Sequence, residues 1–272
     1  MRDRTGLASA GRRRTNGDVN IRYLLGIEGK RVLVTGASSG IGLATAIEIA
    51  NHGGRVVALA RDSARLADAM ARLRGTGHSS VEYDLSDLEG IPVLVQGIAR
   101  SMEGLDAIVH CAGLHSARPL ASVEPTDIRR VMDVNVNAAI MLAKGFRHRQ
   151  VQKVAPSIVL LSSSLGLVGQ AGTSVYSASK GALVSLAKSL ALELARQDIR
   201  VNAVCPGIVE TEMTENLART IGPQAFESIR LAHPLGLGTP QDVAATILFL
   251  LSDASRWITG SVIAVDGGYT AQ

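Results

Sequence analysis

The chain has 272 residues, of which 46% are hydrophobic and 19% charged, so it is long and apolar enough for one α/β domain with a sizeable core. Its two cysteines make neither a disulfide scaffold nor a metal site, and no apolar run reaches the ~18 residues of a membrane span, so we expect a cytoplasmic protein without a metal. The net charge of +4 comes from residues 1–22, which hold six arginines and two aspartates. The rest of the chain is neutral, which argues against nucleic-acid binding.

Residues 1–24 form a basic N-terminal extension. They lack the apolar stretch of a secretory signal, and no hydrophobic segment follows their arginine run. We interpret them as a disordered extension, and the alternative is an arm that binds a polyanion. Residues 25–272 are predicted to form a single domain, since no linker-like stretch divides them.

The first predicted strand, residues 31–34, leads into the glycine-rich turn TGASSGIG at 35–42 and then into a helix over 41–52. Unpaired backbone N–H groups at a helix start, together with the helix dipole, favour a pyrophosphate there. Glycines allow such a turn and let phosphates approach the backbone. The predicted cofactor-binding residues of the turn are Gly36, Ser38, Ser39, Gly40, Ile41 and Gly42. The alternative is an ordinary turn between strand and helix without a ligand.

Apolar strands alternate with amphipathic helices along the rest of the chain. Further strands are predicted at 56–59, 81–83, 107–110, 158–161, 201–204 and 262–265, and further helices at 63–74, 91–102, 126–150, 175–196 and 241–251. This pattern predicts an α/β fold with a single Rossmann-type, doubly wound, seven-stranded parallel sheet and helices on both faces. The insert at 207–240 follows a strand end, where such sheets bind ligands, and we interpret it as a mobile substrate lid.

The end of the second strand bears on the choice of nicotinamide cofactor. An acidic residue there often pairs with the adenosine ribose, but this strand ends at Ala60 and Arg61 follows. Because an arginine is a charge-assisted partner for a 2′-phosphate, we predict NADP(H), with NAD(H) as the alternative cofactor. In the alternative interpretation Arg61 is solvated. In either case we expect Asp62 to cap the helix that starts near Ser63.

Asp84 and Leu85 follow the third predicted strand. The Asp84 carboxylate could accept a hydrogen bond from the adenine amino group, while Leu85 offers a backbone N–H. The alternative is that Asp84 is a turn or helix-cap aspartate with no ligand contact.

A serine, a tyrosine and a lysine carry the predicted chemistry. Tyr176 and Lys180 are four residues apart in a helical segment and so share one face of it. A nearby ammonium should lower the pKa of the phenol from about 10, so that Tyr176 can donate a proton to a developing alkoxide or remove one in reverse. Ser163 lies at a strand end, where its hydroxyl can hold the carbonyl oxygen beside the phenol. A tyrosine and lysine at this spacing alone would more often be a surface pair.

With these residues identified, residues 29–268 resemble the classical short-chain dehydrogenase/reductase family. The shared motifs are the TGxxxGxG turn at 35–42, the triad of Ser163, Tyr176 and Lys180, and the VNxxxPGxxxT stretch at 201–211. The resemblance implies that Asn135 is the fourth catalytic residue, holding a water that passes protons through Lys180. It also implies that Lys180 binds the nicotinamide ribose.

The resemblance extends to the nicotinamide end of the cofactor site. The residues implied there are Pro206, Gly207, Ile208 and Thr211. The backbone of Ile208 would meet the carboxamide, and Thr211 would meet a cofactor phosphate or the carboxamide.

The chain departs from the family pattern after its fourth strand, where His110 and Cys111 replace two asparagines. We still predict that the cofactor contacts Cys111, Ala112 and Gly113. The Ala-Gly half of the family's Asn-Asn-Ala-Gly motif is kept, and it lets the backbone approach the cofactor closely. We predict that His110 is structural rather than catalytic, and that Cys111 is a small buried residue. The glycine turn also lacks the arginine with which that family binds the 2′-phosphate. Arg61 is therefore the main residue that indicates NADP(H) rather than NAD(H).

Residues and resemblance together predict an oxidoreductase that transfers a hydride between NADP(H) and a carbonyl or secondary alcohol, with Tyr176 as general acid and base. The nearest alternative is a 3-oxoacyl-(acyl-carrier-protein) reductase, which needs a basic surface for its acidic carrier. That surface could be Arg147, Arg149, Lys153 and Arg196. Epimerase or dehydratase relatives tend to have a longer C-terminal domain, and enoyl reductase relatives space tyrosine and lysine more widely. A different class is an NADP-binding sensor without turnover, although such relatives usually lose the tyrosine or the lysine.

The predicted partner is a small, mainly apolar carbonyl or alcohol substrate, with no nucleic acid and no membrane. The apolar residues that suggest this pocket are Leu114, Leu167, Met213, Leu217, Ile221 and Phe226. The family usually forms homotetramers through two long helices, here 126–150 and 175–196, and a homodimer is the alternative. The apolar seam would be Ala138, Met141, Leu142, Leu183, Leu186 and Leu190, unless these side chains pack within the subunit.

Overall fold

The computed structural model describes residues 26–148 and 151–271, and its centre is a parallel sheet of seven strands in the order β3-β2-β1-β4-β5-β6-β7. The strands are β1 (Arg31–Thr35), β2 (Arg55–Ala60), β3 (Ser79–Glu82), β4 (Leu105–His110), β5 (Gln152–Leu161), β6 (Arg200–Pro206) and β7 (Val262–Val265). The predicted fold class is therefore confirmed. The strand order reverses between β1 and β4, and such sheets bind ligands at the carboxyl ends of the strands at this switch point.

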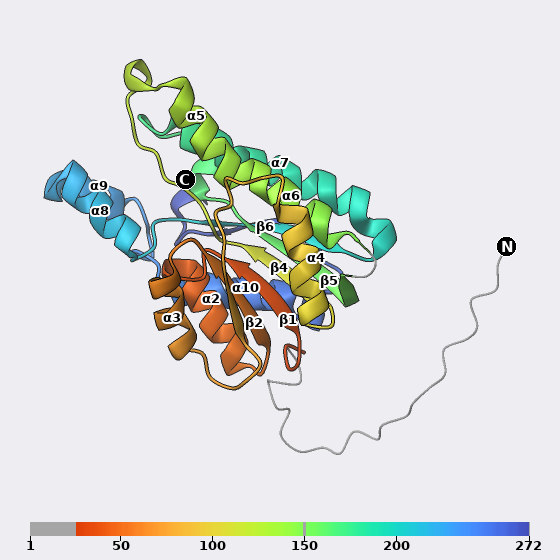
Figure 1. Cartoon of the computed structure of the whole chain (residues 1–272). Coiled ribbons are helices and arrows are strands. Elements are labelled where there is room, and N and C mark those ends of the chain that lie inside the picture. The colour runs from red at the N-terminus through yellow and green to blue at the C-terminus, as the bar shows by residue number, and fades with distance from the viewer. Residues whose placement is uncertain (1–25, 149–150, 272) are drawn as a thin grey trace.

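Helices cover both faces of the sheet (Figure 1). They are α2 (Gly40–Asn51), α3 (Ser63–Ala71), α4 (Ile91–Ser101), α5 (Pro125–Met132), α6 (Ala138–Phe146), α7 (Ser174–Leu194), α8 (Glu212–Ile221), α9 (Pro223–Leu231) and α10 (Pro240–Leu251). One hydrophobic core lies between the sheet and α4, α6 and α7, and the other between the sheet and α2, α3 and α10. None of the described helices is both long and apolar enough to cross a membrane.

Successive side chains of a strand point to opposite faces of the sheet, so each strand contributes residues to both cores. In β1, Leu33 belongs to the core under α4, α6 and α7, whereas Val32 and Val34 belong to the core under α2 and α10. In β4, Ile108 and Val109 divide in the same way. A strand buried on both faces has a continuous apolar sequence, which is why these strands could be recognised from short β-branched runs.

Two predicted elements differ from the structure. The helix predicted over 126–150 is interrupted by a π-helical turn, η2 (Asp133–Asn137), which separates α5 from α6, and α6 ends at Phe146. The insert predicted as a lid, 207–240, contains two helices, α8 and α9, that project from the body of the fold (Figure 1). The basic extension at 1–24 and Arg149 lie outside the described residues.

Helix caps fix where several helices begin. The predicted cap at Asp62 is confirmed, because its carboxylate accepts a hydrogen bond from the Arg65 N–H at 3.0 Å. Thr239 and Asp242 form a capping box at the start of α10. Thr211 caps α8, which sets the direction in which the lid leaves the sheet.

Candidate active site

The switch point of the sheet is held together by Thr35, the last residue of β1, and His110, the last residue of β4. Thr35 Oγ1 accepts from the Ala112 N–H at 3.2 Å and lies 3.0 Å from His110 Nδ1. Either atom can be the donor in this second contact, depending on the tautomer of the imidazole. Burial lowers the pKa of His110 to about 4, while backbone groups of Asn135 and Val134 oppose this by favouring the proton. His110 is thus a neutral side chain that braces the site.

The glycine turn packs closely against the chain that follows β4. Gly36 has φ +66°, and a Cβ there would lie 2.8 Å from the Ala112 nitrogen. A Cβ on Gly40 would lie 3.4 Å from Thr211 Cγ2, so the structure brings together two residues predicted to bind the cofactor. Ser39 begins α2 without a side-chain cap, which leaves backbone N–H groups of the first turn for an anion. The turn therefore fits the pyrophosphate of a dinucleotide.

Replacing Gly42 with alanine is expected to damage both the turn and cofactor binding. A Cβ on Gly42 would overlap the carbonyl of Gly36, which is rigid backbone, so the turn would have to open. We expect dinucleotide affinity to fall at least about tenfold and stability by about 1–3 kcal/mol. Fluorescence titration with NADPH and thermal unfolding would measure the two effects. Gly169→Ala is the matched control, since a Cβ at Gly169 meets nothing within 4 Å.

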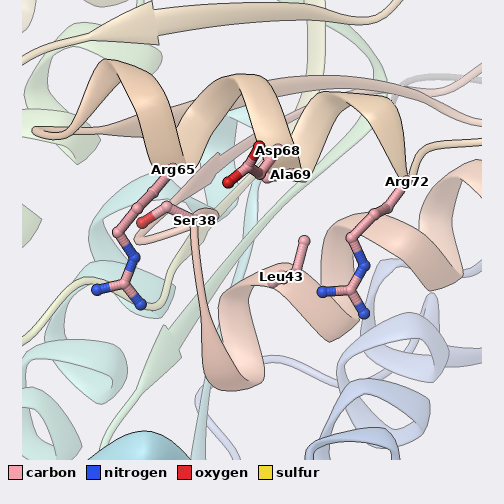
Figure 2. A pocket seen from close by; sticks show the side chains of 6 residues that line it. All are labelled: Ser38, Leu43, Arg65, Asp68, Ala69 and Arg72. Carbon is pink, nitrogen blue, oxygen red and sulfur yellow. The ribbon is translucent and has the colours of Figure 1, made fainter.

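Arginines gather on the side of the glycine turn that faces α3. Ser38, Leu43, Arg65, Asp68, Ala69 and Arg72 line a cavity of about 200 Å³ between the turn, α2 and α3. Figure 2 shows Arg65 and Arg72 extending from α3 to either side of Leu43, with Ser38 beside Arg65. Arg61 is exposed. Arg65 Nη2 also pairs with Glu212 Oε2 of α8 at 2.6 Å, an ion pair that joins this side of the site to the lid.

Asp84 makes a turn hydrogen bond after β3. Its Oδ1 accepts from the Ser86 N–H at 2.9 Å. That hydrogen bond is the main cause that lowers the pKa of Asp84, and the positive charge of Arg61 acts in the same direction. Leu85 is buried. The adenine contact of Asp84 and Leu85 stays a prediction.

The catalytic candidates meet at the carboxyl end of β5. Ser163 follows this strand, and its Oγ accepts from the Leu165 N–H at 3.2 Å. Tyr176 and Lys180 lie one turn apart on α7, with Lys180 Nζ 5.7 Å from the centre of the Tyr176 ring. Lys180 Nζ donates to the Leu161 carbonyl at 2.7 Å, which fixes the buried ammonium at the end of β5.

Burial dominates the protonation of this group. It raises the pKa of Tyr176 to about 12, although a hydrogen bond with Ser163 lowers it. It lowers the pKa of Lys180 to about 8. The prediction that the ammonium lowers the pKa of the phenol is therefore wrong for this structure, because desolvation of the phenolate outweighs an ammonium that faces the Leu161 carbonyl. The phenol keeps its proton at neutral pH, as the acid of a carbonyl reduction should.

Asn135 lies in the π-helical turn η2, which aims its side chain inward. Its Oδ1 accepts from the Leu114 N–H at 2.7 Å, and its Nδ2 donates to the Leu114 carbonyl at 3.1 Å and to Ser179 Oγ at 2.9 Å. Ser179 Oγ donates in turn to the Tyr176 carbonyl at 2.7 Å. A π-turn inside a helix often marks a functional position. The contact of Ser179 with Asn135 was not predicted from the sequence. The only signal for it is the position of Ser179 between Tyr176 and Lys180.

The loop after β4 closes over Lys180 and Asn135. A Cβ on Gly113 would lie 3.3 Å from both Lys180 Nζ and Asn135 Oδ1, so only glycine leaves these groups free. Cys111, expected to be buried, is half-buried, and its desolvation raises the pKa of the thiol to about 12. The cysteine is therefore an unreactive thiol at neutral pH.

Ile208 already has partners for both of its backbone polar groups. Its N–H donates to His233 Nε2 at 3.1 Å, and its carbonyl accepts from the Gly238 N–H at 3.0 Å. His233 Nδ1 lies 2.8 Å from the Ile229 carbonyl at the end of the lid. A carboxamide contact at Ile208 stays a prediction; through the N–H it would have to replace the bond to His233, whereas the carbonyl can accept a second hydrogen bond. Sequence reasoning did not identify His233.

Comparisons with known proteins identify the family of the chain. The family model described as Enoyl-(Acyl carrier protein) reductase matches residues 36–270. The cis-4-hydroxycyclohexanecarboxylate dehydrogenase of Sinomonas cyclohexanicum is 39% identical over 246 residues, covering 88% of this chain and 96% of the relative. The 3-oxoacyl-(acyl-carrier-protein) reductase of Thermotoga maritima is 35% identical over 245 residues, covering 89% of this chain and 98% of the relative.

Solved structures share the fold. A structure described as an NAD(P)-dependent gluconate 5-dehydrogenase from Beutenbergia cavernae, with NADP bound at low occupancy, is 32% identical with a TM-score of 0.84. It covers 91% of this chain, which in turn covers 99% of it. The glycine turn, the serine after β5, the tyrosine and lysine on α7, and these matches lead to one conclusion. The chain belongs to the short-chain dehydrogenase/reductase family of oxidoreductases.

Proposed function

We propose that this protein interconverts a carbonyl compound and a secondary alcohol with NADP(H). The observation that carries the proposal is the meeting of Ser163, Tyr176, Lys180 and Asn135 beside the glycine turn. All four side chains are held by hydrogen bonds or burial, so the group is organised before any substrate arrives. Such preorganisation is what stabilises charge in a transition state.

Each residue has a separate task in this reaction. When bound, the nicotinamide supplies or accepts the hydride. The Ser163 hydroxyl holds the substrate oxygen beside the phenol, and Tyr176 gives its proton to the developing alkoxide in the reducing direction. Lys180, fixed by the Leu161 carbonyl, holds the nicotinamide ribose, and Asn135 holds a water through which the proton is replaced.

The preference for NADP(H) is part of the proposal. It is supported by Arg61, which follows β2 where an acid would repel a 2′-phosphate, and by Arg65 and Arg72, which line the same cavity as Ser38. Phosphate and guanidinium form charge-assisted hydrogen bonds. Several arginines at one end of the site would favour the cofactor that carries the additional phosphate.

Replacing Arg61 with alanine is expected to weaken NADPH binding about tenfold or more, because a hydrogen bond to a charged group contributes about 1.5–3 kcal/mol. NADH affinity should change less than about twofold, since NADH has no 2′-phosphate. Fluorescence titration of both cofactors measures the two affinities. Arg74→Ala, an exposed arginine beyond the end of α3, is the matched control. An equal loss for both cofactors would contradict the assignment.

Reduction of an oxoacyl group on a carrier protein is the second candidate within this class, and the position of the basic residues disfavours it. Arg147 ends α6, Arg196 follows α7, and Lys153 lies near the start of β5. Helices α6 and α7 lead into the amino ends of β5 and β6, so these exposed charges lie at the opposite end of the sheet from Tyr176. A carrier docked there would hold its acyl chain away from the site.

One experiment tests the proposal against the sensor alternative. The purified protein is titrated with NADPH and NADH and then offered a panel of carbonyl compounds that includes 3-oxoacyl thioesters. Turnover that prefers NADPH is the expected result. Tight NADPH binding without turnover of any carbonyl would contradict the proposed enzyme and favour a sensor.

Assembly into a homotetramer, or a homodimer, also belongs to the proposal. The residues predicted for the apolar seam pack within the subunit instead: Ala138, Leu142 and Leu183 are buried, and Met141, Leu186 and Leu190 are half-buried against the same core. Other apolar side chains on these helices are exposed, namely Ile128, Ile140 and Leu192. An interface through α5, α6 and α7 would have to use the exposed set, and the mass in solution would test it.

A further inference from the structure

His115 is an active-site side chain that the proposed chemistry does not use. It lies in the loop after β4, two residues beyond Gly113. Its imidazole stands edge-on to the Tyr176 ring, with ring centres 4.7 Å apart and an angle of 62° between the planes. A substrate whose oxygen contacts the Tyr176 phenol would therefore have its neighbouring atoms beside this imidazole.

The backbone around His115 is fixed on both sides. Leu114 makes two hydrogen bonds to the Asn135 side chain, at 2.7 and 3.1 Å. Further along the loop, the Arg118 N–H donates to the Gly172 carbonyl at 2.7 Å, which ties this loop to the one before α7. The imidazole is thus held at the mouth of the site by the same residue, Asn135, that supports the catalytic group.

Neither ring nitrogen of His115 has a hydrogen-bond partner among the described residues. The side chain is half-buried, so its nitrogens can bind a polar group of a substrate. Burial and the charge of Lys180 both lower the pKa of His115. Across residues 26–148 and 151–271, Lys180 is the only charged group with a resolved influence on this imidazole. Among the described residues, the charge that acts on this imidazole is therefore positive.

We infer that His115 binds a second polar group of the substrate, and that this group is a carboxylate a few bonds from the reacting carbon. The inference rests on the proposed function and narrows its substrate class to oxo acids and hydroxy acids. A neutral imidazole donates one N–H to the carboxylate, and the bound anion favours protonation of the ring into a charge-assisted pair. A cationic substrate would be repelled by Lys180. The apolar lid would then cover the remaining carbon skeleton.

The test compares oxo acids with their methyl esters. The two members of a pair differ in the charge of the carboxyl group, and the pairs differ from one another in the distance between the carboxyl group and the ketone. We expect the wild-type enzyme to prefer at least one acid over its ester by about tenfold or more in kcat/KM. In His115→Phe, which keeps an aromatic edge against Tyr176, that preference should fall about tenfold, through KM rather than kcat. His115→Gln, which keeps a donor, should retain part of it. His148→Phe, an exposed histidine at the end of α6, is the matched control.

Two results would overturn the inference. One is a wild-type enzyme that treats every acid and its ester alike. The other is a His115→Phe variant that loses kcat equally for both, since His115 would then only support Tyr176. If neither member of any pair turns over, the proposed function fails, and calorimetry with cyclohexanecarboxylate and the protein saturated with NADP⁺ decides the inference by itself. Binding that is absent, or equal in wild type and His115→Phe, overturns it.

Discussion

Replacing Tyr176 with phenylalanine should reduce kcat by about 10²–10⁴-fold while NADPH affinity changes little, because the general acid is lost but the ring remains. The pKa of Tyr176, raised by burial to about 12, keeps the phenol protonated at neutral pH. The hydroxyl is thus ready to give a proton to the alkoxide as it forms. Steady-state kinetics and a fluorescence titration of NADPH would measure the two quantities.

The control for this variant is Tyr269→Phe. Tyr269 stacks on His233, with ring centres 4.7 Å apart, and phenylalanine retains that stack. We expect near wild-type kcat from this control. If Tyr176→Phe kept more than about a tenth of wild-type turnover, Tyr176 would not be the general acid.

Replacing Lys180 with methionine should lower kcat/KM on the order of 10²–10³-fold and weaken NADPH binding about tenfold. Methionine has similar length, but it cannot donate to the Leu161 carbonyl or hold the ribose. The result would separate Lys180 from Tyr176, since only the lysine variant should lose both turnover and cofactor affinity. Lys188→Met, an exposed lysine two turns along α7, is the matched control.

The pH dependence gives Lys180 a second test. Burial lowers its pKa to about 8, so the ammonium is present below that pH and is lost as the pH rises through it. We expect kcat/KM for carbonyl reduction to fall above about pH 8, and this limb of the profile to disappear in Lys180→Met. A wild-type profile that stays flat well above pH 8 would contradict the role of the charged lysine.

The strands, and the placement of Tyr176 near Lys180, could be predicted because each follows from a local signal. A strand buried on both faces is a short apolar run, and Tyr176 and Lys180 share a helix face because they are four residues apart. The π-turn could not be predicted from periodicity, because the apolar pattern of α5 and α6 continues across Asp133–Asn137. Only the hydrogen bonds of Asn135 to Leu114 and Ser179 show why the helix widens there.

The remaining errors concern quantities that depend on burial or on distant contacts. The pKa of Tyr176 was expected to fall because the ammonium could be read from the sequence, whereas desolvation of the phenol could not. The place of His115 against Tyr176 depends on a loop of irregular structure, for which there is no sequence period. Helices α8 and α9 could not be predicted from the sequence, because glycine and proline at 222–223 divide the helical segment into two short pieces.

No side chain of α8 or α9 is buried, which gives these two helices an evolutionary freedom that the buried cores lack. A residue there can be exchanged without opening a cavity in either core, so new variants are tolerated by folding. The catalytic group has no such freedom, because it lies among buried residues of β5 and α7. Natural selection can therefore change the substrate while the chemistry is inherited intact. In the laboratory, the two lid helices are the segment to randomise in a library that seeks a new substrate.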